Sequence, residues 1–322
     1  MPWYTVHCIC DALTPSTDEP SMSSHFTADT LALLHATPTS PSGATRRLAL
    51  RTALGVGYAA AAWPLMAQTA IKTPRTGLVD GEIMIDVNGF QMPAYRSAPV
   101  GKTDLPVVLV ISEIFGVHEY IADVTRRYAQ LGYLAIAPEL FVRQGDPSAY
   151  GEIAKIQSEV IAKVPDAQVM GDLDATLQWA ARNGGTPARA AVTGFCWGGR
   201  IAWLYSAHNP RLKAGVAWYG RVEGASSPNT PQHPMARAAE LKAPVLGLYG
   251  GADTGIPVAS VERMKEALSL AATQGHAAAR DSRLVIYPDA PHAFHADYRA
   301  SYRADVASDS WQRAVAWIQR YL

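Results

Sequence analysis

The sequence predicts an α/β fold with a mostly parallel central sheet, helices on both faces and an antiparallel hairpin at its N-terminal edge. Short apolar runs alternate with helical segments from residue 105 onward, an order typical of parallel strands joined by helical crossovers. These runs are continuous, as in strands that are covered on both faces. Before them, two alternating segments flank Asn88 and Gly89, a dipeptide that favours a hairpin turn.

The individual elements follow from these patterns in chain order. The hairpin strands are expected at residues 81–87 and 91–97. Continuous apolar runs predict the other strands at residues 105–112, 133–137, 190–193, 214–218, 243–249 and 283–287. Helical periodicity predicts helices at residues 118–131, 148–163, 167–182, 199–208, 257–272 and 308–321. Because no repeat or linker interrupts this alternation, residues 71–322 are expected to form a single domain, and a monomer is favoured.

The first 70 residues differ from the rest in composition. Residues 11–45 are rich in Ser, Thr, Pro and Asp, which predicts a disordered leader. Arg46 and Arg47 follow, and after them comes an Ala-, Gly- and Leu-rich run that is too weakly apolar for a stable membrane span.

A twin arginine before a mildly apolar stretch resembles a twin-arginine export signal. We therefore expect an exported or periplasmic protein, cleaved between Ala67 and Ala70. The alternative is a helix with chance arginines in a cytoplasmic protein. Because 45 residues precede Arg46, a true start as late as Met22 would fit a signal better.

Charge and cysteine content exclude several classes of protein. The 322 residues contain 28 Lys and Arg and 28 Asp and Glu, a net charge of zero, which does not indicate nucleic-acid binding. Without residues 1–70 the balance is 25 basic (28 minus 3) and 24 acidic (28 minus 4) residues. Three cysteines do not make a disulfide framework, and only Cys196 lies outside the leader.

The sharpest motif surrounds this cysteine. Gly194-Phe195-Cys196-Trp197-Gly198-Gly199 lies between an expected strand and an expected helix, the context of a nucleophile elbow with Cys in place of Ser. The glycines allow the tight turn, and the adjacent helix N-terminus favours a thiolate. Cys196 is therefore the candidate nucleophile. The alternative is a buried structural cysteine in a Gly-rich turn.

A nucleophile elbow predicts an acid and then a histidine later in the chain. Asp253 follows the apolar run at 243–249, and His292 follows the run at 283–287. His292 would take the thiol proton and later protonate the leaving group, while Asp253 would orient the imidazole. Taken singly, Asp253 could be a helix N-cap and His292 a solvated loop residue, but their order after Cys196 favours a triad.

The loop after the run at 105–112 has a second candidate role. In this arrangement an oxyanion hole combines the N–H after the nucleophile, here Trp197, with an N–H from a loop after an early strand, here Ile114. Glu113 stands at the same strand end and could accept a hydrogen bond from the resting thiol. The alternative for Glu113 is a solvated charge at a strand end.

Taken together, these motifs resemble the dienelactone hydrolase (carboxymethylenebutenolidase) family of α/β-hydrolases. The resemblance covers about residues 77–322 and rests on Glu113-Ile114-Phe115-Gly116, Ala137-Pro138-Glu139-Leu140, the elbow, Gly250-Gly251-Ala252-Asp253 and Ala290-Pro291-His292-Ala293-Phe294. It implies an α/β-hydrolase fold and an ester or lactone opened through a thioester, with Cys196, Asp253 and His292 as the triad. It also implies that Glu113 pairs with the resting thiol until a substrate displaces it. No metal or organic cofactor is implied.

The match to the family's substrate site is incomplete. Family members that act on dienelactone hold its carboxylate with two arginines. Arg143 fits the first position, but Ala296 stands at the second, four residues after His292. Arg299 lies three residues further on and could reach in. The sequence therefore leaves open whether the substrate is dienelactone or a different ester or lactone.

Two rival functions remain open. One is a cysteine hydrolase of another bond, a thioester or a peptide, and the other is a non-catalytic thiol protein in which Cys196 senses oxidants or binds a ligand. The remaining histidines show no metal-ligand spacing, so surface or capping roles are expected for His118, His208, His233, His276 and His295. The expected partner is a small-molecule ester or lactone.

Overall fold

An eight-stranded sheet runs through residues 71–322, the part of the chain that the computed structural model describes. The disordered leader, the twin-arginine signal and its cleavage site, all predicted for residues 1–70, lie outside the described residues. The sheet has the order β1-β2-β4-β3-β5-β6-β7-β8. Its strands are β1 (Leu78–Val87), β2 (Phe90–Pro99), β3 (Leu105–Ile111), β4 (Leu134–Pro138), β5 (Gly185–Phe195), β6 (Leu212–Trp218), β7 (Val245–Gly250) and β8 (Arg283–Tyr287).

The N-terminal hairpin forms one edge of this sheet, as predicted. β1 and β2 pair antiparallel, and their turn places Asn88 and Gly89 at φ angles of 53° and 89°. Positive φ at both central positions is the geometry that Asn-Gly adopts most easily. The Gly89 N–H also donates to the Asp86 carboxylate at 3.1 Å, which closes the turn. β2 then pairs antiparallel with β4 and joins the hairpin to the main sheet.

The other strands are parallel, and most of their residues are buried except in the edge strand β8 and the first half of β5. β3 pairs with β4 and β5, and the pairing continues through β6 and β7 to β8. Every residue of β4 and β7 is buried, which agrees with the continuous apolar runs from which these strands were predicted. The predicted fold class is therefore confirmed.

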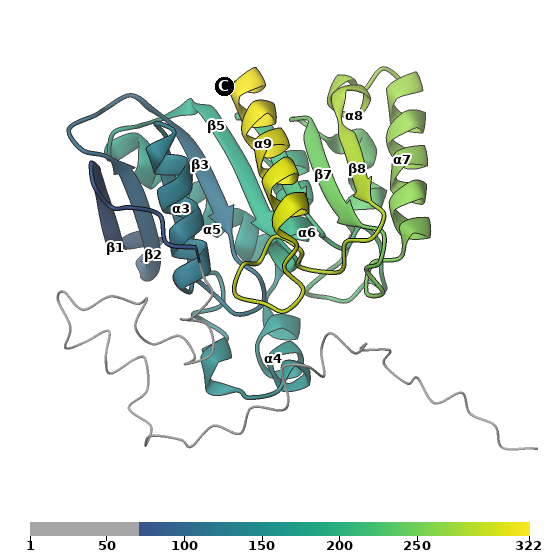
Figure 1. The fold of residues 1–322 in the computed structure, drawn as a ribbon, viewed down its shortest axis with the longest axis horizontal. Coiled ribbons are helices and arrows are strands. Elements are labelled where there is room, and N and C mark those ends of the chain that lie inside the picture. The colour runs from purple at the N-terminus through teal and green to yellow at the C-terminus, as the bar shows by residue number, and fades with distance from the viewer. Residues whose placement is uncertain (1–70) are drawn as a thin grey trace, which may run out of the picture.

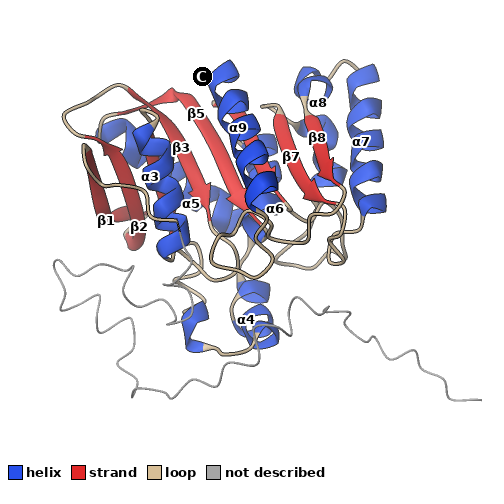
Figure 2. Ribbon diagram, in the orientation of Figure 1, coloured by secondary structure: helices blue, strands red, loops and turns tan. Residues whose placement is uncertain are grey.

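Helices cover both faces of the sheet (Figure 1 and Figure 2). On one face α3 packs on β2, β3 and β4, and α9 packs on β6 and β7, while α5 and α6 cover the other face around β5. The helices are α3 (Glu119–Gln130), α4 (Ile153–Glu159), α5 (Asp166–Arg182), α6 (Trp197–His208), α7 (Val258–Thr273), α8 (Ala277–Asp281) and α9 (Ala304–Tyr321).

Residues 148–163 differ from the single helix expected there. They form the short 3-10 turn η3 (Pro147–Ala149), the two-turn helix α4 and the turn η4 (Ile161–Lys163). This segment lies beyond the carboxyl ends of the strands, below the sheet in Figure 1. Two further elements had no expectation from the sequence, namely α8 and the 3-10 segment η5 (Pro234–Glu240).

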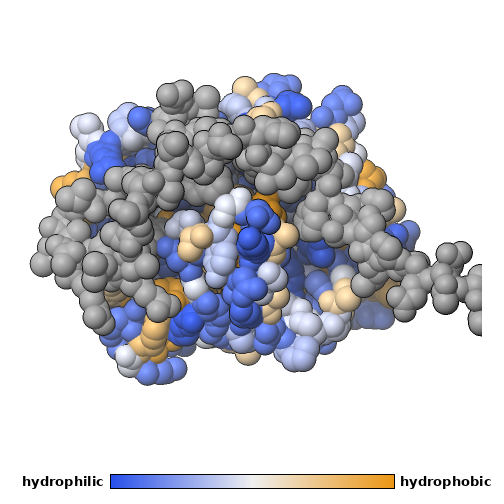
Figure 3. All heavy atoms as spheres, turned by 90° about the horizontal axis from the view of Figure 1, so that it is seen from below, coloured by the Kyte–Doolittle hydropathy of each residue, from blue (hydrophilic) through white to orange (hydrophobic). Residues whose placement is uncertain are grey.

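The side of the molecule with α4 and the strand-end loops faces the viewer in Figure 3. The described surface visible there is mainly hydrophilic, with small apolar areas. Within residues 71–322, none of the helices combines the length and apolar character needed to cross a membrane.

Candidate active site

The predicted site residues follow the carboxyl ends of four strands of the sheet. Glu113 comes after β3, Cys196 directly follows β5, Asp253 follows β7 and His292 follows β8. Between β3 and β5 the strand order changes direction, since β4 lies on one side of β3 and β6 on the far side of β5. In open α/β sheets, ligands bind at such a switch point, beyond the carboxyl ends of the strands.

The turn around Cys196 has the strained geometry of a nucleophile elbow. Cys196 adopts a φ of 55° and a ψ of −113° at the N-cap of α6, a region that side-chain-bearing residues rarely occupy. The glycines make this turn possible, because a Cβ on Gly194 would lie 2.0 Å from the Gly198 carbonyl oxygen. A Cβ on Gly198 would lie 2.4 Å from the Ile111 oxygen. These close backbone contacts explain why the motif has glycine at both positions, as the sequence predicted.

The loop after β7 fixes the Asp253 carboxylate. One oxygen, Oδ1, accepts the N–H groups of Gly255 at 2.9 Å and Ile256 at 3.0 Å. The other, Oδ2, lies 2.6 Å from His292 Nδ1. Asp253 is 4% exposed, and the helix that follows is capped by Pro257. Asp253 is therefore bonded to His292 and is not a helix cap.

The loops of Asp253 and His292 are packed backbone against backbone. The Ala252 N–H donates to the Ala290 carbonyl at 3.1 Å, and a Cβ on Gly250 would lie 2.2 Å from the same oxygen. The Tyr219 ring, at the end of β6, meets the His292 ring edge-on with 5.1 Å between ring centroids. These contacts leave the imidazole with 26% of its side-chain surface exposed.

Electrostatics couple His292 to Cys196. Burial lowers the pKa of His292, but the negative form of Cys196, hydrogen bonds with Asp253 and Cys196, and the charge of Asp253 together raise it to about 10. An imidazole with this pKa carries its proton at neutral pH while the sulfur is negative. An imidazole coupled in this way to a sulfur can serve as its proton partner, which is the arrangement that cysteine nucleophiles use.

Glu113 is engaged in a different pairing from the one expected. Its Oε2 accepts hydrogen bonds from Tyr298 Oη at 2.6 Å and His118 Nε2 at 3.3 Å. Its Oε1 is buried and has no hydrogen-bond partner among the described residues, so no hydrogen bond joins Glu113 to Cys196 there. The role of Glu113 as the partner of the resting thiol stays a prediction.

Two backbone amides face no acceptor. Within residues 71–322, neither the Ile114 N–H nor the Trp197 N–H donates a hydrogen bond. Ile114 follows Glu113 directly, and Trp197 is the first residue of α6, so both amides flank the strand ends where the nucleophile lies. Two free N–H donors beside a nucleophile are what an oxyanion hole requires.

The predicted substrate arginine is occupied elsewhere. Arg143 forms a bidentate ion pair with Asp172 at 2.7 and 2.9 Å and lies 4.1 Å from the Phe90 ring centroid. Arg299 differs, because its guanidinium makes no hydrogen bond or ion pair with the rest of the described chain. Its pKa is raised, since the effect of burial, which lowers it, is outweighed by electrostatic interactions with Tyr298, Glu113, Cys196 and Tyr219. Arg299 therefore lies within electrostatic range of the thiol.

Sequence reasoning missed three residues in and around this site. His118 and His295 were expected at the surface or in caps, but both are buried, with 5% and 2% exposure. His118 contacts Glu113, and His295 pairs with Tyr120 at 2.6 Å. The other missed residue is Tyr298, which is 185 positions from its partner Glu113. Its only sequence signal is its place on the loop of His292.

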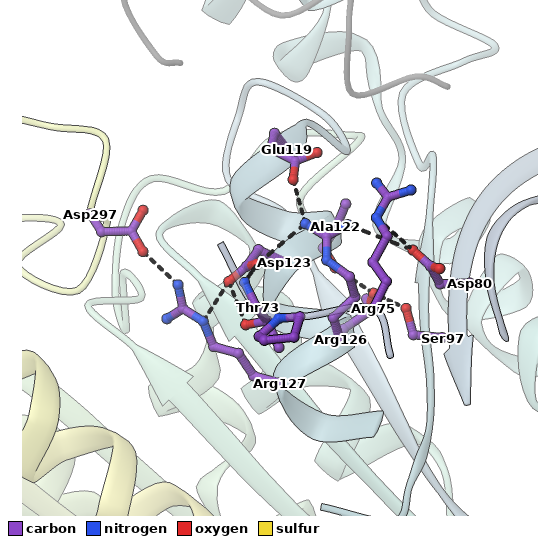
Figure 4. A network of polar contacts seen from close by, with 12 residues as sticks. Thr73, Arg75, Asp80, Ser97, Glu119, Ala122, Asp123, Arg126, Arg127 and Asp297 are labelled. Carbon is purple, nitrogen blue, oxygen red and sulfur yellow. Dashed lines mark hydrogen bonds and ion pairs between the residues drawn. The ribbon is translucent and has the colours of Figure 1, made fainter. Parts of the chain in front are cut away.

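A network of ion pairs and hydrogen bonds joins α3 to the loop that carries His292 and Asp297 (Figure 4). Arg127 of α3 donates to Asp123 at 2.7 Å and to Asp297 at 2.5 Å. Asp123 also accepts the N–H and hydroxyl of Thr73 at 2.6 and 3.1 Å. Asp297 is the neighbour of Tyr298, so the network connects the start of the described chain, α3 and the His292 loop.

The described residues contain no group of three or more His, Cys, Asp or Glu side chains placed to hold a metal ion. Of the predicted site residues, the structure brings Cys196, Asp253 and His292 into contact. Arg143 is instead bound to Asp172.

Comparisons with known proteins agree with this architecture. The model of the dienelactone hydrolase family matches residues 92–322. A protein of Methylorubrum extorquens named "Putative carboxymethylenebutenolidase" is 55% identical over 277 residues, which cover 86% of this chain and 93% of that protein. A Bradyrhizobium protein named "Probable 2-oxo-3-(5-oxofuran-2-ylidene)propanoate lactonase" is 30% identical over 74% of this chain and 93% of its own length.

A solved structure gives the same result. The crystal structure of a protein described as a "Putative Dienelactone Hydrolase" from Klebsiella pneumoniae superimposes with a TM-score of 0.73 at 53% identity. The match covers 76% of this chain and 99% of that one. Because the family model spans most of the chain and full-length relatives exceed 50% identity, the protein belongs to the dienelactone hydrolase family.

Proposed function

We propose that this protein hydrolyses a carboxylic ester or lactone through a thioester at Cys196. The observation that carries the proposal is the hydrogen-bonded line from Asp253 through His292 to Cys196, placed on a nucleophile elbow. Family membership and a relative named as a lactonase support the reaction class.

Acylation would begin with the sulfur as nucleophile. The Cys196 thiolate attacks the carbonyl carbon, an S–C bond forms, and the π electron pair moves to the carbonyl oxygen. The amides of Ile114 and Trp197 would stabilise that oxyanion. When the tetrahedral intermediate collapses, the C–O bond breaks and the leaving alkoxide takes the proton from His292 Nε2. In a lactone, the alcohol released stays attached to the acyl group.

Deacylation follows from the loss of charge on the sulfur. In the thioester, Cys196 is neutral, so the negative charge that most strongly raises the pKa of His292 is gone. The imidazole can then accept a proton from water at neutral pH, and the hydroxide formed attacks the thioester carbon. The S–C bond breaks and the thiolate leaves with its electron pair, which restores the thiolate–imidazolium pair.

We infer that Arg299, rather than Arg143, would meet an anionic group on the substrate. Arg143 already pairs with the Asp172 carboxylate through two of its N–H groups, whereas the charge of Arg299 acts on Cys196 and Glu113. A charge-assisted hydrogen bond contributes about 1.5–3 kcal/mol. Arg299 would therefore favour esters or lactones that carry a carboxylate near the scissile bond.

The experiment that tests this function uses the Cys196→Ala variant and mass spectrometry. Wild-type protein mixed with p-nitrophenyl acetate should gain one acetyl group on Cys196, and Cys196→Ala should gain none and lose hydrolysis of the ester. Unchanged turnover of the ester by Cys196→Ala would contradict the proposed mechanism.

The same measurements separate the two rival functions. A panel of lactones, thioesters and peptides tests the first rival. If only a thioester or a peptide acylates Cys196, the protein is a cysteine hydrolase of that bond. A non-catalytic thiol sensor would form a sulfenic acid at Cys196 under peroxide and no acyl adduct with any ester.

A further inference from the structure

An irregular segment connects β6 to η5 at the carboxyl edge of the sheet. Residues 220–233 contain no helix or strand. Connections of this length without secondary structure are uncommon in compact domains, and many of them are functional loops. The segment begins directly after Tyr219, whose ring contacts that of His292 with 5.1 Å between the centroids. We call residues 220–233 the strap, which begins beside the candidate site.

The strap is tied to three neighbouring elements. Asn229 accepts a hydrogen bond from the Asp166 N–H of α5 and donates one to the Ala162 carbonyl of η4, both at 2.8 Å. Glu223 forms an ion pair with Arg263 of α7. Because η4 follows α4, these contacts join the strap to the segment that lies beyond the carboxyl ends of the strands (Figure 1).

Arg200, in the first turn of α6, holds the end of the strap. It is 4% exposed and forms a bidentate ion pair with Asp166, with both hydrogen bonds at 2.7 Å. The same guanidinium donates to the Gln232 carbonyl at 2.8 Å and, through Nε, to His233 Nδ1 at 3.3 Å. The His233 ring also packs on Gly224, where an added Cβ would lie 3.0 Å from the ring. His233 therefore lies between Arg200 and the beginning of the strap.

The hydrogen bonds of His233 require a neutral ring. Its Nε2 lies 3.1 Å from the Ala225 carbonyl oxygen, which can only accept, and its Nδ1 faces the Nε–H of Arg200, which can only donate. The ring must therefore carry its proton on Nε2 and a lone pair on Nδ1. A second proton, on Nδ1, would point at the Arg200 N–H and place two cations side by side.

The surroundings of His233 disfavour this second proton. Burial lowers the pKa of His233, and so do the charges of Arg200 and Arg221, which together outweigh the raising effects of the Ala225 carbonyl and Asp166. When the strap is released, the ring enters water and its pKa returns to about 6.5. Protonation is then more favourable in the released state than in the closed one. The closed strap is therefore most stable above about pH 6.5, and this stability is lost as the pH falls below that value.

We propose that His233 is a pH-sensitive latch, in which the neutral ring holds the strap on Arg200 and the protonated ring releases it. A solvent proton binds the Nδ1 lone pair, and the hydrogen bond from Arg200 is lost. Because Asn229 joins the strap to η4, release also loosens the segment from η3 to η4 and widens the approach to the candidate site. This role goes beyond the proposed hydrolysis and does not depend on the reaction that occurs at the site.

Hydrogen–deuterium exchange of the full-length protein tests the latch. Exchange is measured by mass spectrometry at pH 7.5 and pH 5.5 and expressed as protection factors, which remove the intrinsic effect of pH. The informative peptides contain the Asp166 and Thr230 amides, which are bonded to Asn229 and Ser227 of the strap. Their protection should fall by about three- to tenfold at pH 5.5, because a histidine with a pKa of about 6.5 favours the released state by about tenfold one unit below its pKa.

Two variants of His233 separate the latch from a general effect of acid. His233→Gln does not titrate and can still accept from Arg200, so its protection should be the same at both pH values. His233→Lys keeps a positive charge beside Arg200, so its protection should already be low at pH 7.5. His208→Gln is the matched control, because His208 is an exposed histidine that pairs with Asp174 and not with the strap. The wild-type fall in protection should persist in this variant.

Equal protection at pH 7.5 and pH 5.5 in the wild-type protein would overturn the proposal. A fall that persists in His233→Gln would overturn it as well, since another group would then be the sensor. Glu223 is not such a group, because the hydrogen bonds from Arg263 lower the pKa of its carboxyl. Neither outcome bears on the test of function, which is read as acylation of Cys196.

Discussion

The Asp253 carboxylate shows how one loop residue acquires a fixed direction. Two backbone N–H groups hold Oδ1, which leaves Oδ2 for the imidazole at 2.6 Å. Its position could be predicted because the residue follows a strand and precedes a histidine in the required order. The backbone donors that orient it could not, since they depend on the local turn after β7.

We expect Asp253→Asn to lower kcat by about 10³–10⁴-fold for ester substrates. The amide keeps the shape of the carboxylate but cannot stabilise the imidazolium, and it can present an N–H to His292 instead of an oxygen. Steady-state kinetics measures the loss, with thermal unfolding to verify that the variant is folded. Asp289→Asn is a matched control, because Asp289 is an exposed residue on the His292 loop; a comparable loss there would contradict the assignment.

The pH dependence of the free enzyme should follow the raised pKa of His292. With its pKa at about 10, the proton that His292 would give to the leaving group is present below pH 10 and lost as the pH rises through that value. We therefore expect kcat/KM for alkyl esters to decline only near pH 10. Nitrophenyl esters, whose leaving group needs no proton, should show a weaker decline. An alkyl-ester profile that falls near pH 7 would refute the ion pair.

At the scale of elements, strands were more predictable than helices. Continuous apolar runs found every buried strand, because burial on both faces leaves a composition that no turn or exposed helix shares. The first residues of β5 were missed, since Gly185 and Thr186 are polar or small and pair with β3 only across an irregular register. Their strand state depends on a distant partner.

The single helix expected over residues 148–163 failed for a similar reason. The apolar spacing there is helical, but the segment breaks into η3, α4 and η4. Contacts from far along the chain hold it, because Asn229 donates to the Ala162 carbonyl at 2.8 Å and accepts the Asp166 N–H at 2.8 Å. Local periodicity carries no information about such contacts.

Residues 71–77, which form an arm at the start of the described chain, should contribute measurably to the stability of the fold. Thr73 donates its N–H and hydroxyl to Asp123, which is 1% exposed and also binds Arg127. Thr73→Val removes the hydroxyl bond to a charged group and should lower the free energy of unfolding by about 1.5 kcal/mol. For a protein of this size that corresponds to roughly 3–6 °C in Tm.

Differential scanning fluorimetry measures this change. Thr76→Val is the control, because Thr76 is exposed on the same arm and its side chain makes no hydrogen bond with the other described residues. Equal Tm values for the two variants would mean that the Thr73–Asp123 contact does not stabilise the fold.

For the molecule as a whole, topology decides which distant residues meet. The parallel order β3-β5-β6-β7-β8 brings the carboxyl ends of β3, β5, β7 and β8 to one edge of the sheet. Residues as far apart as Glu113 and Tyr298, which are separated by 185 positions, therefore meet there. The sequence predicted this gathering because each candidate follows a strand. It could not predict that Arg143 would pair with Asp172 of α5, because an ion pair between residues of different elements produces no local sequence pattern.

The balance of charge sets how an anionic substrate reaches this site. Because the net charge is zero, no long-range field draws in anions, and attraction must come from local groups such as Arg299. We expect kcat/KM for a carboxylated ester to change by less than about threefold between 20 and 200 mM salt, since screening acts mainly on long-range steering.

Arg299→Gln should raise KM for that carboxylated ester by about tenfold or more and leave KM for a neutral ester unchanged. Arg303→Gln, an exposed arginine nearby, serves as the control; equal losses on both esters in Arg299→Gln would show that the arginine supports the loop instead of binding the anion.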